Sequence, residues 1–454
     1  MRFYGRNEEL SVLHRQFELV QTNRVARMAV VTGRRRIGKT TLVLKAFASG
    51  VVPFVYLFVS KAETEESLAA TLIATIGTQL SVAYPPSLRN LSQAVAWAMH
   101  LSQTRPFVLM IDECQDLSSV NSGFWAQLQK VWDLNKSNSQ LLLIMSGSIQ
   151  SALEKIFGAQ SEPLFGRADV LMTVSAFTTQ EMMEIFQDQT PTAQDTDLLT
   201  LYALTGGVAR YVELFVDAGA VKQKEMLDFV FSGNGSWYRA EGYLMAANEF
   251  RLEAPIYMEI LRKVAAGQTK WAQIQDGIAG SISPYMRRLE ELFRIIRRQY
   301  PIESKASLRQ MRFSVADAYF RFWLRFISSG LAQALAETQH WENLKNSVVE
   351  NLPTFMGRTL EDWFRQQCRE SGHWAQVGAW WDRKGENEID LVAIDRSGKR
   401  LLIAEVKTNP AKYDSIRLSA KAESFLTVNP QFKDFELKLR GLSVQNMTDT
   451  NTFV

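Results

Sequence analysis

The chain has 454 residues, 46% hydrophobic and 22% charged, which is ordinary for a soluble globular protein of about three domains. Its formal net charge of only +3 excludes a global field for nucleic acid, so any basic surface must be local. Two cysteines and four histidines indicate neither a disulfide framework nor a zinc site. No apolar run approaches about 18 residues and no signal-peptide core is present, so we expect a cytoplasmic protein without a membrane partner.

A phosphate-binding loop is the first motif along the chain, and it fits the pattern G-x-x-x-x-G-K-[ST]. An apolar, β-branched run precedes it and a helical pattern follows it, which is the context that this motif requires. Glycines let successive backbone N–H groups point at an anion, and the following helix adds its positive N-terminus. We expect Lys39 to reach the β- and γ-phosphates and the Thr40 hydroxyl to ligate Mg²⁺. The loop residues predicted to bind ATP are Gly33, Arg34, Arg35, Arg36, Ile37, Gly38, Lys39, Thr40 and Thr41.

Residues 1–176 are predicted to form the ATPase core, an α/β domain with a mostly parallel sheet. Short β-branched runs alternate with helical stretches, and the runs lack the polar alternation of half-exposed strands. Five candidate strands follow from this pattern: Met28–Thr32, Phe54–Val59, Phe107–Ile111, Leu141–Met145 and Val170–Val174.

Two acids end the third of these strands, where an ATPase needs carboxylates. We expect Asp112 to hold Mg²⁺ through water and Glu113 to orient and deprotonate the attacking water. The alternative is a pair of solvated acids at a strand end. The next strand ends in Ser146-Gly147-Ser148, so Ser146 or Ser148 is a candidate sensor of the γ-phosphate, with a plain exit from strand to turn as the alternative.

Four further segments are predicted after the ATPase core. Helices dominate residues 177–250, which we interpret as a helical lid. Residues 251–315 are interpreted as a winged helix, and residues 316–354 as a helical linker to a last domain over 355–454. The elements of the winged helix are Pro255–Ala266, Trp271–Ala279, Pro284–Phe293, Ile295–Tyr300 and Met311–Val315.

The third helix of the winged helix, with Ser283 as its N-cap, is the candidate DNA-recognition helix. The alternative is a protein-docking module whose arginines pair with acids of neighbouring domains. The stretch Phe313–Phe326 has aromatic residues at helical spacing and is predicted to be core rather than a platform for stacked bases. The arginines that would contact DNA phosphates are Arg287, Arg288, Arg294, Arg297 and Arg298.

Three strands are predicted in the last domain, over Ala375–Asp382, Glu388–Ile394 and Arg400–Lys407. Period-two alternation places Glu405 and Lys407 on one face of the third strand, and the hairpin brings Asp390 alongside. Two carboxylates can hold Mg²⁺, and a nearby lysine can orient or activate a water. Glu361, on an amphipathic stretch, can add a third carboxylate. The alternative is a charged surface, or a nuclease fold that only binds.

These motifs together resemble the archaeal-type ATPase family, in the AAA+-related and STAND branch of P-loop NTPases. The family usually has proline where this chain has Ala209, so the lid contact is the weakest match. Many members carry a winged helix and a nuclease-like domain in this order, so the resemblance covers essentially the whole chain. The matching segments are Phe3-Tyr4-Gly5-Arg6-Asn7-Glu8-Glu9-Leu10, the phosphate-binding loop, Ile111-Asp112-Glu113, Ser146-Gly147-Ser148, Leu164-Phe165-Gly166-Arg167 and Thr205-Gly206-Gly207-Val208-Ala209-Arg210-Tyr211.

The resemblance implies an α/β fold: a P-loop NTPase parallel sheet with a helical lid, a winged-helix module and a C-terminal restriction-endonuclease-like α/β domain. Gly5 and Arg6 would pack against the adenine. Arg167 and Arg210 would touch the γ-phosphate, in cis or from a neighbouring subunit, with surface ion pairs as the alternative. The last domain resembles the PD-(D/E)xK superfamily at Glu361, Asp390 and Glu405, which would hold metal, and at Lys407.

Two hypotheses of different classes follow. The first is an ATPase that uses ATP and Mg²⁺ and is coupled to a DNA-binding, Mg²⁺-dependent nuclease-like domain. Its candidate catalytic residues are Lys39, Glu113, Arg167 and Lys407. The alternative is a nucleotide-dependent signalling switch whose C-terminal domain is catalytically inactive. DNA is the expected partner under the first hypothesis, and either one allows a homo-oligomer or a partner protein.

Overall fold

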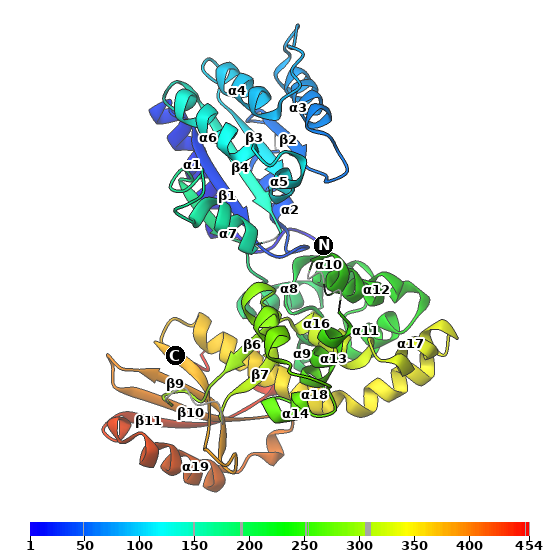
Figure 1. The fold of residues 1–454 in the computed structure, drawn as a ribbon. Helices are drawn as coiled ribbons and strands as arrows, with labels where there is room; N and C mark the ends of the chain where they lie inside the picture. The colour runs from blue at the N-terminus through cyan, green and yellow to red at the C-terminus, as the bar shows by residue number, and fades with distance from the viewer. Residues whose placement is uncertain are drawn as a thin grey trace. The chain divides into compact units, whose positions relative to one another are not determined.

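The computed structural model describes residues 1–48, 50–148, 150–190, 194–249, 252, 254–304, 310–449 and 451–453. The chain divides into two compact units (Figure 1). One comprises residues 4–176, and the other comprises residues 1–3 together with 177–454. The first unit is drawn in blue to green-cyan in Figure 1, and the second runs from green to red.

A five-stranded parallel sheet forms the centre of the first unit. Its order is β2-β3-β4-β1-β5, so β4 lies between the strand before the phosphate-binding loop and the strand that ends in the two acids. Every residue of β3 and β4 is buried, as expected for strands covered on both faces. The predicted α/β sheet is confirmed, with strands β1 Arg27–Thr32, β2 Phe54–Phe58, β3 Phe107–Asp112, β4 Leu141–Gly147 and β5 Val170–Thr173.

Helices cover this sheet and complete its core. Side chains of α3, α4 and α6 form one apolar cluster with alternate residues of the strands, such as Leu109 and Leu143. Helix α1 packs on α2 and on strands β1 and β4. The helices of this unit are α1 Asn7–Asn23, α2 Lys39–Phe47, α3 Glu65–Leu80, α4 Leu91–Leu101, α5 Leu117–Val120, α6 Phe124–Asn135 and α7 Gln150–Gly158.

A helical segment opens the second unit and shares its core with a later helix. The Tyr319 hydroxyl donates to the Tyr238 carbonyl at 2.7 Å, and the Trp323 indole donates to the Arg239 carbonyl at 2.7 Å. Both side chains are fully buried on α16, so the prediction that this aromatic stretch is core is confirmed. The helices are α8 Thr179–Gln189, α9 Asp195–Thr205, α10 Ala209–Asp217, α11 Gln223–Val230, α12 Ser236–Leu244 and α16 Ala318–Phe326.

Three helices and an antiparallel hairpin follow among the described residues of the segment that we interpreted as a winged helix. The third helix, α15, is shorter than predicted, because it continues as a π-helical turn over Arg288–Leu292. Strands β6 and β7 pair antiparallel from Ile296 with Val315 to Gln299 with Arg312. The elements are α13 Pro255–Ala265, α14 Trp271–Gln275, α15 Ser283–Arg287, β6 Ile296–Gln299 and β7 Arg312–Val315.

A mixed four-stranded sheet ends the chain, in the order β11-β10-β9-β8. Strand β9 pairs antiparallel with β8 and β10, while β11 pairs parallel with β10 through the crossover helix α19. The 30-residue helix α18 leads into this sheet and spans the predicted boundary at 354/355. The elements are α17 Gly330–Glu337, α18 Trp341–Glu370, β8 Gln376–Trp381, β9 Glu388–Asp395, β10 Arg400–Lys407, α19 Ser415–Val428 and β11 Glu436–Ser443.

Candidate functional site

The phosphate-binding loop connects β1 to α2 through two glycines in left-handed conformations. Gly33 has φ 146° and a Cβ there would lie 2.5 Å from the Val174 carbonyl oxygen, so no larger residue fits. Gly38 has φ 97° and precedes the first residue of α2. Lys39 reaches back over the loop and donates to the carbonyls of Gly33 and Arg34 at 2.9 and 3.2 Å. The loop therefore places a buried ammonium beside the start of a helix.

The two ATPase motifs meet at Thr40 and Asp112. The Thr40 hydroxyl donates to Asp112 Oδ2 at 2.7 Å, and the Tyr56 hydroxyl donates to the same oxygen at 3.2 Å. Burial, and then the negative charge of Asp112, raises the pKa of Tyr56, so it stays a neutral donor. A hydroxyl and a carboxylate at this distance are the oxygen donors that suit Mg²⁺. Tyr56 was not predicted, because its place beside Asp112 depends on β2 pairing with β3.

Glu113 is held in place by two side chains. Its backbone has φ 52°, a conformation that is costly for a residue with a long side chain. Gln115 Nε2 and Ser148 Oγ donate to Glu113 Oε2 at 2.5 and 2.8 Å. Strand β4 thus brings the predicted sensor residue Ser148 to the predicted general base. The Gln115 side chain passes closely over Gly147, where a Cβ would lie 2.0 Å from its amide oxygen. Sequence reasoning missed Gln115.

The remaining predicted nucleotide residues divide between the loop and three separate arginines. Arg6 is buried, donating to the Ser175 carbonyl at 2.5 Å and to Glu9 at 3.2 Å, and Gly5 before it has φ 59°. Arg35 and Thr41 are exposed, Ile37 is buried, and Arg34 and Arg36 are half-buried. The Arg6 guanidinium is therefore held by the Ser175 carbonyl and the Glu9 carboxylate.

The side chains of Arg167 and Arg210 each form an ion pair with a carboxylate in the structure. Arg167 donates two parallel hydrogen bonds to the Asp133 carboxylate, at 3.0 and 2.8 Å. Arg210, on a helix of the second unit, pairs with Glu213 at 2.6 Å and lies 5.8 Å from the centre of the Trp237 ring. Each guanidinium would have to leave its carboxylate partner before it could contact a phosphate.

An acidic site forms where β9 and β10 run side by side. Lys407 Nζ lies 3.1 Å from Glu405 Oε1 and 3.7 Å from Asp390 Oδ2. A second lysine, Lys421 on α19, donates to Glu405 Oε1 at 3.0 Å. The Val406 N–H donates to Asp390 Oδ2 at 2.8 Å. The structure therefore brings together three of the four predicted residues and adds Lys421.

The two carboxylates of this site respond differently to burial. Burial raises the pKa of Asp390, although the Val406 N–H and Lys407 oppose the shift. Burial acts in the same direction on Glu405, but hydrogen bonds from Lys421 and Lys407 outweigh it and lower the pKa of that carboxyl. Glu405 Oε2 is buried without a hydrogen-bond partner. An unpaired anionic oxygen beside Asp390 fits a divalent cation, since Mg²⁺ binds through one or two carboxylates and keeps several waters.

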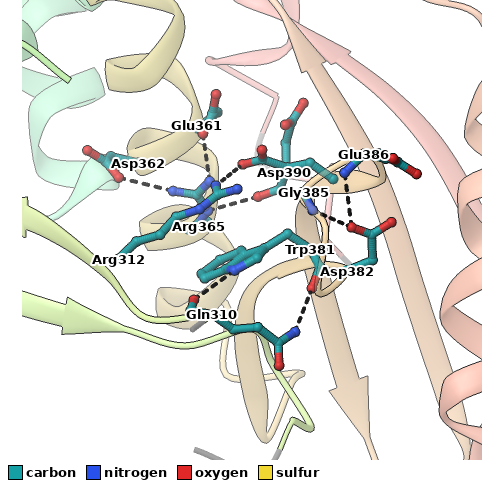
Figure 2. A network of polar contacts seen from close by, with 11 residues as sticks. Gln310, Arg312, Glu361, Asp362, Arg365, Trp381, Asp382, Gly385, Glu386 and Asp390 are labelled. Atoms are coloured by element: carbon teal, nitrogen blue, oxygen red, sulfur yellow. Dashed lines mark hydrogen bonds and ion pairs between the residues drawn. The ribbon is translucent and has the colours of Figure 1, made fainter. Parts of the chain in front are cut away.

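Glu361 is not gathered into a three-carboxylate set. Arg365, one turn further along α18, donates to Glu361 Oε2 at 2.7 Å and to the Asp390 carbonyl at 2.8 Å (Figure 2). Burial raises the pKa of Glu361 to about 7 even though the guanidinium opposes it. Among the described residues, no three His, Cys, Asp or Glu side chains lie close enough together to hold a metal ion. The expected joint ligation by Glu361, Asp390 and Glu405 is therefore corrected to an arginine-tied Glu361 beside a two-carboxylate pair.

Two of the five arginines that were predicted to contact DNA form ion pairs with acids. Arg287 pairs with Glu291 at 2.8 Å, and Arg298 pairs with Glu290. Arg288 lies over the rings of Tyr257 and Phe293, within 5.9 and 5.6 Å of their centres. Arg294 and Arg297, the other two arginines of the predicted cluster, are exposed.

Comparisons with known proteins match both ends of the chain. Residues 3–215 match a family described as an ATPase domain predominantly from Archaea, and residues 323–418 match DUF234, described as archaeal and bacterial proteins of unknown function. An uncharacterised protein of Methanocaldococcus jannaschii is 25% identical over 419 residues, which are 90% of this chain and 88% of that protein. A Walker-type ATPase of Pyrococcus abyssi has the same fold, with a TM-score of 0.51 and 20% identity over 71% of this chain and 96% of that one.

Within the part of the chain that the structure describes, every helix is too short or too polar to cross a membrane. The parallel sheet, the loop with its lysine and the paired acids agree with the family match over the same residues. Residues 3–215 therefore belong to the archaeal-type ATPase domain family, and the chain carries a DUF234 domain behind them.

Proposed function

We propose that the protein hydrolyses ATP at the site built by β1, β3 and β4. The observation that carries this proposal is that Ser148 and Gln115 fix Glu113 close to the hydrogen-bonded pair of Thr40 and Asp112. Lys39 binds the β- and γ-phosphates, and Thr40 with Asp112 holds Mg²⁺, which neutralises charge on the transferred group. Glu113 takes a proton from the water that attacks the γ-phosphorus, and ADP leaves.

Glutamine at position 113 tests this proposal. Glu113→Gln keeps the shape and the hydrogen bonds but removes the base, so we expect at least about 100-fold slower hydrolysis with ATP binding retained. Lys39→Ala should lose ATP binding itself. Glu18→Gln, in an exposed pair with Arg15, is the matched control and should keep the full rate. Full hydrolysis by Glu113→Gln would show that another group acts as the base.

We propose as a second function that the C-terminal domain cleaves DNA with Mg²⁺. Two observations support this second function. The side chains of Asp390, Glu405 and Lys407 lie together, and Glu405 Oε2 has no hydrogen-bond partner. Asp390 and Glu405 would hold the cation, which polarises the phosphodiester and its attacking water. Lys407 would orient that water, whose oxygen replaces one ester oxygen on phosphorus. The competing proposal is a signalling switch in which this site only binds a partner, a second copy or another protein.

Cleavage assays on full-length protein separate these two proposals. With Mg²⁺ or Mn²⁺ present, the wild type should cut some member of a panel of DNA structures, and Lys407→Ala should not. ATP binding by the variant should be unchanged. Equal residual cleavage by Lys407→Ala would reject the nuclease assignment. Tightly retained nucleotide with neither DNA-stimulated hydrolysis nor cleavage would favour the switch.

A further inference from the structure

The hairpin of the winged helix is docked on the last domain (Figure 2). The Trp381 indole donates to the Gln310 carbonyl at 2.8 Å, and the Gln310 amide donates back to the Trp381 carbonyl at 3.4 Å. Just after β6, the Ile302 N–H donates to the Ala379 carbonyl of β8 at 2.9 Å. Hydrogen bonds between backbones and a buried indole hold the two modules in one arrangement.

Arg312 on β7 extends this contact to the strand of the acidic site. Its guanidinium lies 4.2 Å from the centre of the Trp381 ring and pairs with Glu388 at 2.6 Å. Glu388 begins β9, and Asp390 stands two residues later on the same face of that strand. The winged helix and the acidic site therefore lie in the same compact unit and are joined by these contacts.

The turn between β8 and β9 carries two cations on a fixed backbone. The Asp382 carboxylate accepts the N–H groups of Gly385, Glu386 and Asn387 at 2.5, 2.9 and 3.0 Å. Against the effect of burial, the Asn387 side-chain amide, which donates to Asp382 Oδ2 at 2.8 Å, and then these N–H groups hold the pKa of Asp382 below its usual value. The turn is thus held by its own hydrogen bonds, and its residues Arg383 and Lys384 are exposed.

A lysine of the winged helix meets this turn. Lys270, which precedes α14, has its ammonium 3.8 Å from the position of a Cβ on Gly385. We call the surface formed by Lys270, Arg383 and Lys384 the joint surface. None of these three side chains forms an ion pair with a described residue. The exposed acid in the turn is Glu386. One cation of the winged helix therefore lies beside a turn that carries two more exposed cations, and an anionic partner would stabilise such a basic surface.

We propose that the joint surface binds the sugar–phosphate backbone of duplex DNA next to the acidic site, an inference that rests on the proposed DNA function. Strand β9 begins at Glu388, directly after the turn, and advances about 7 Å to Asp390, or about two base-pair rises. A duplex held at the turn therefore reaches the carboxylates without bending. Because the docked hairpin and the Asp382 turn are already ordered, binding costs little conformational entropy.

Salt-dependent binding of a labelled 30-base-pair duplex to the full chain tests the joint surface. Lys270→Ala and Lys384→Ala should each weaken binding about tenfold at moderate salt and reduce the slope of log K against log salt by about 0.9. Glu386→Gln, which removes the local acid, should tighten binding. Lys433→Ala, an exposed lysine of the same domain, is the matched control and should match the wild type.

The outcomes separate this inference from the proposed function. Duplex binding by the wild type with no change in Lys270→Ala and Lys384→Ala overturns the joint surface alone. Loss of binding only in Arg294→Ala and Arg297→Ala assigns the duplex to the arginines of the winged helix instead and also overturns it. A wild type that binds no duplex even at low salt overturns the proposed DNA function together with this inference. Unchanged thermal unfolding of the exposed-site variants confirms that each remains folded.

Discussion

Ser148 at the end of β4 donates a hydrogen bond of 2.8 Å to the Glu113 carboxylate at the end of β3. The bond couples a residue that can face the γ-phosphate to the residue proposed to deprotonate water. Ser148→Ala removes it and leaves Gln115 as the one donor described for Glu113 Oε2. We expect kcat for ATP hydrolysis to fall about tenfold, with KM nearly unchanged, because a charge-assisted hydrogen bond contributes about 1.5 kcal/mol.

Steady-state kinetics on purified protein measures this effect. Thr75→Ala is the matched control, because the Thr75 hydroxyl bonds within its own helix on an exposed face. It should behave as the wild type does. A rise in KM at constant kcat would instead place Ser148 in ground-state binding of ATP.

Gly33→Ala should remove ATP binding by destabilising the loop. An added Cβ would lie 2.5 Å from the Val174 carbonyl and would sit on a backbone with φ 146°. We expect a loss of about 3 kcal/mol in the free energy of unfolding. Gly219→Ala is the control, because Gly219 has φ 65° but open space around it, and about 1 kcal/mol is expected there. Equal losses in chemical denaturation would mean that the contact with Val174 is relaxed easily.

Stability should depend on pH through Glu361. Burial raises the pKa of this carboxyl from 4.5 to about 7, so between these values the folded protein binds more protons than the unfolded chain. The free energy of unfolding should therefore fall by about 3 kcal/mol as pH rises from 4.5 to just above 7, and then level off. Glu361→Gln should flatten this part of the profile, while Glu423→Gln, at an exposed position, should leave it as it is. Stability that rises over this window in the wild type alone would contradict the prediction.

Lys421→Met should strengthen divalent-cation binding at the acidic site. The Lys421 ammonium holds Glu405 Oε1 at 3.0 Å and competes with a cation for that carboxylate. Without this ammonium, its repulsion of a second positive charge at short range is lost. We therefore expect about tenfold tighter binding of Mn²⁺, measured by calorimetry. Lys412→Met is the control on an exposed lysine. Weaker Mn²⁺ binding by Lys421→Met would show that the lysine supports the ligand geometry instead.

The features that could be predicted from the sequence were either strands buried on both faces or motifs made of consecutive residues. Strands β1, β3 and β4 were predictable because a strand covered on both faces reads as an unbroken apolar run. The phosphate-binding loop was predictable because its residues are consecutive. Strand β11 was missed, although Glu436-Leu437-Lys438-Leu439-Arg440 alternates polar and apolar residues, and its first three residues are exposed at the edge of the sheet.

Side chains that complete the sites were missed for a different reason. Tyr56 and Gln115 reach the ATPase acids only through the pairing order of the sheet and the turn after β3. Lys421 reaches Glu405 only because α19 packs over β10. Among these missed residues, Arg365 could have been found from the sequence. It lies four residues after Glu361 on a helix, and side chains at this spacing contact each other.

Helix α18 belongs to two cores at once. Near its start, Leu344 is buried and Lys345 pairs with Asp228 of α11. Near its end the helix contacts β8, β9 and β10 of the last sheet, and Trp363 is buried against Tyr202 of α9. Its final residue, Glu370, accepts hydrogen bonds from both the N–H and the hydroxyl of Thr179 at the start of α8. Dividing the chain after residue 354 would cut this helix and expose apolar surface on both fragments. Residues 177–250 and the last domain are therefore expected to be inherited together, because one helix completes the core of both.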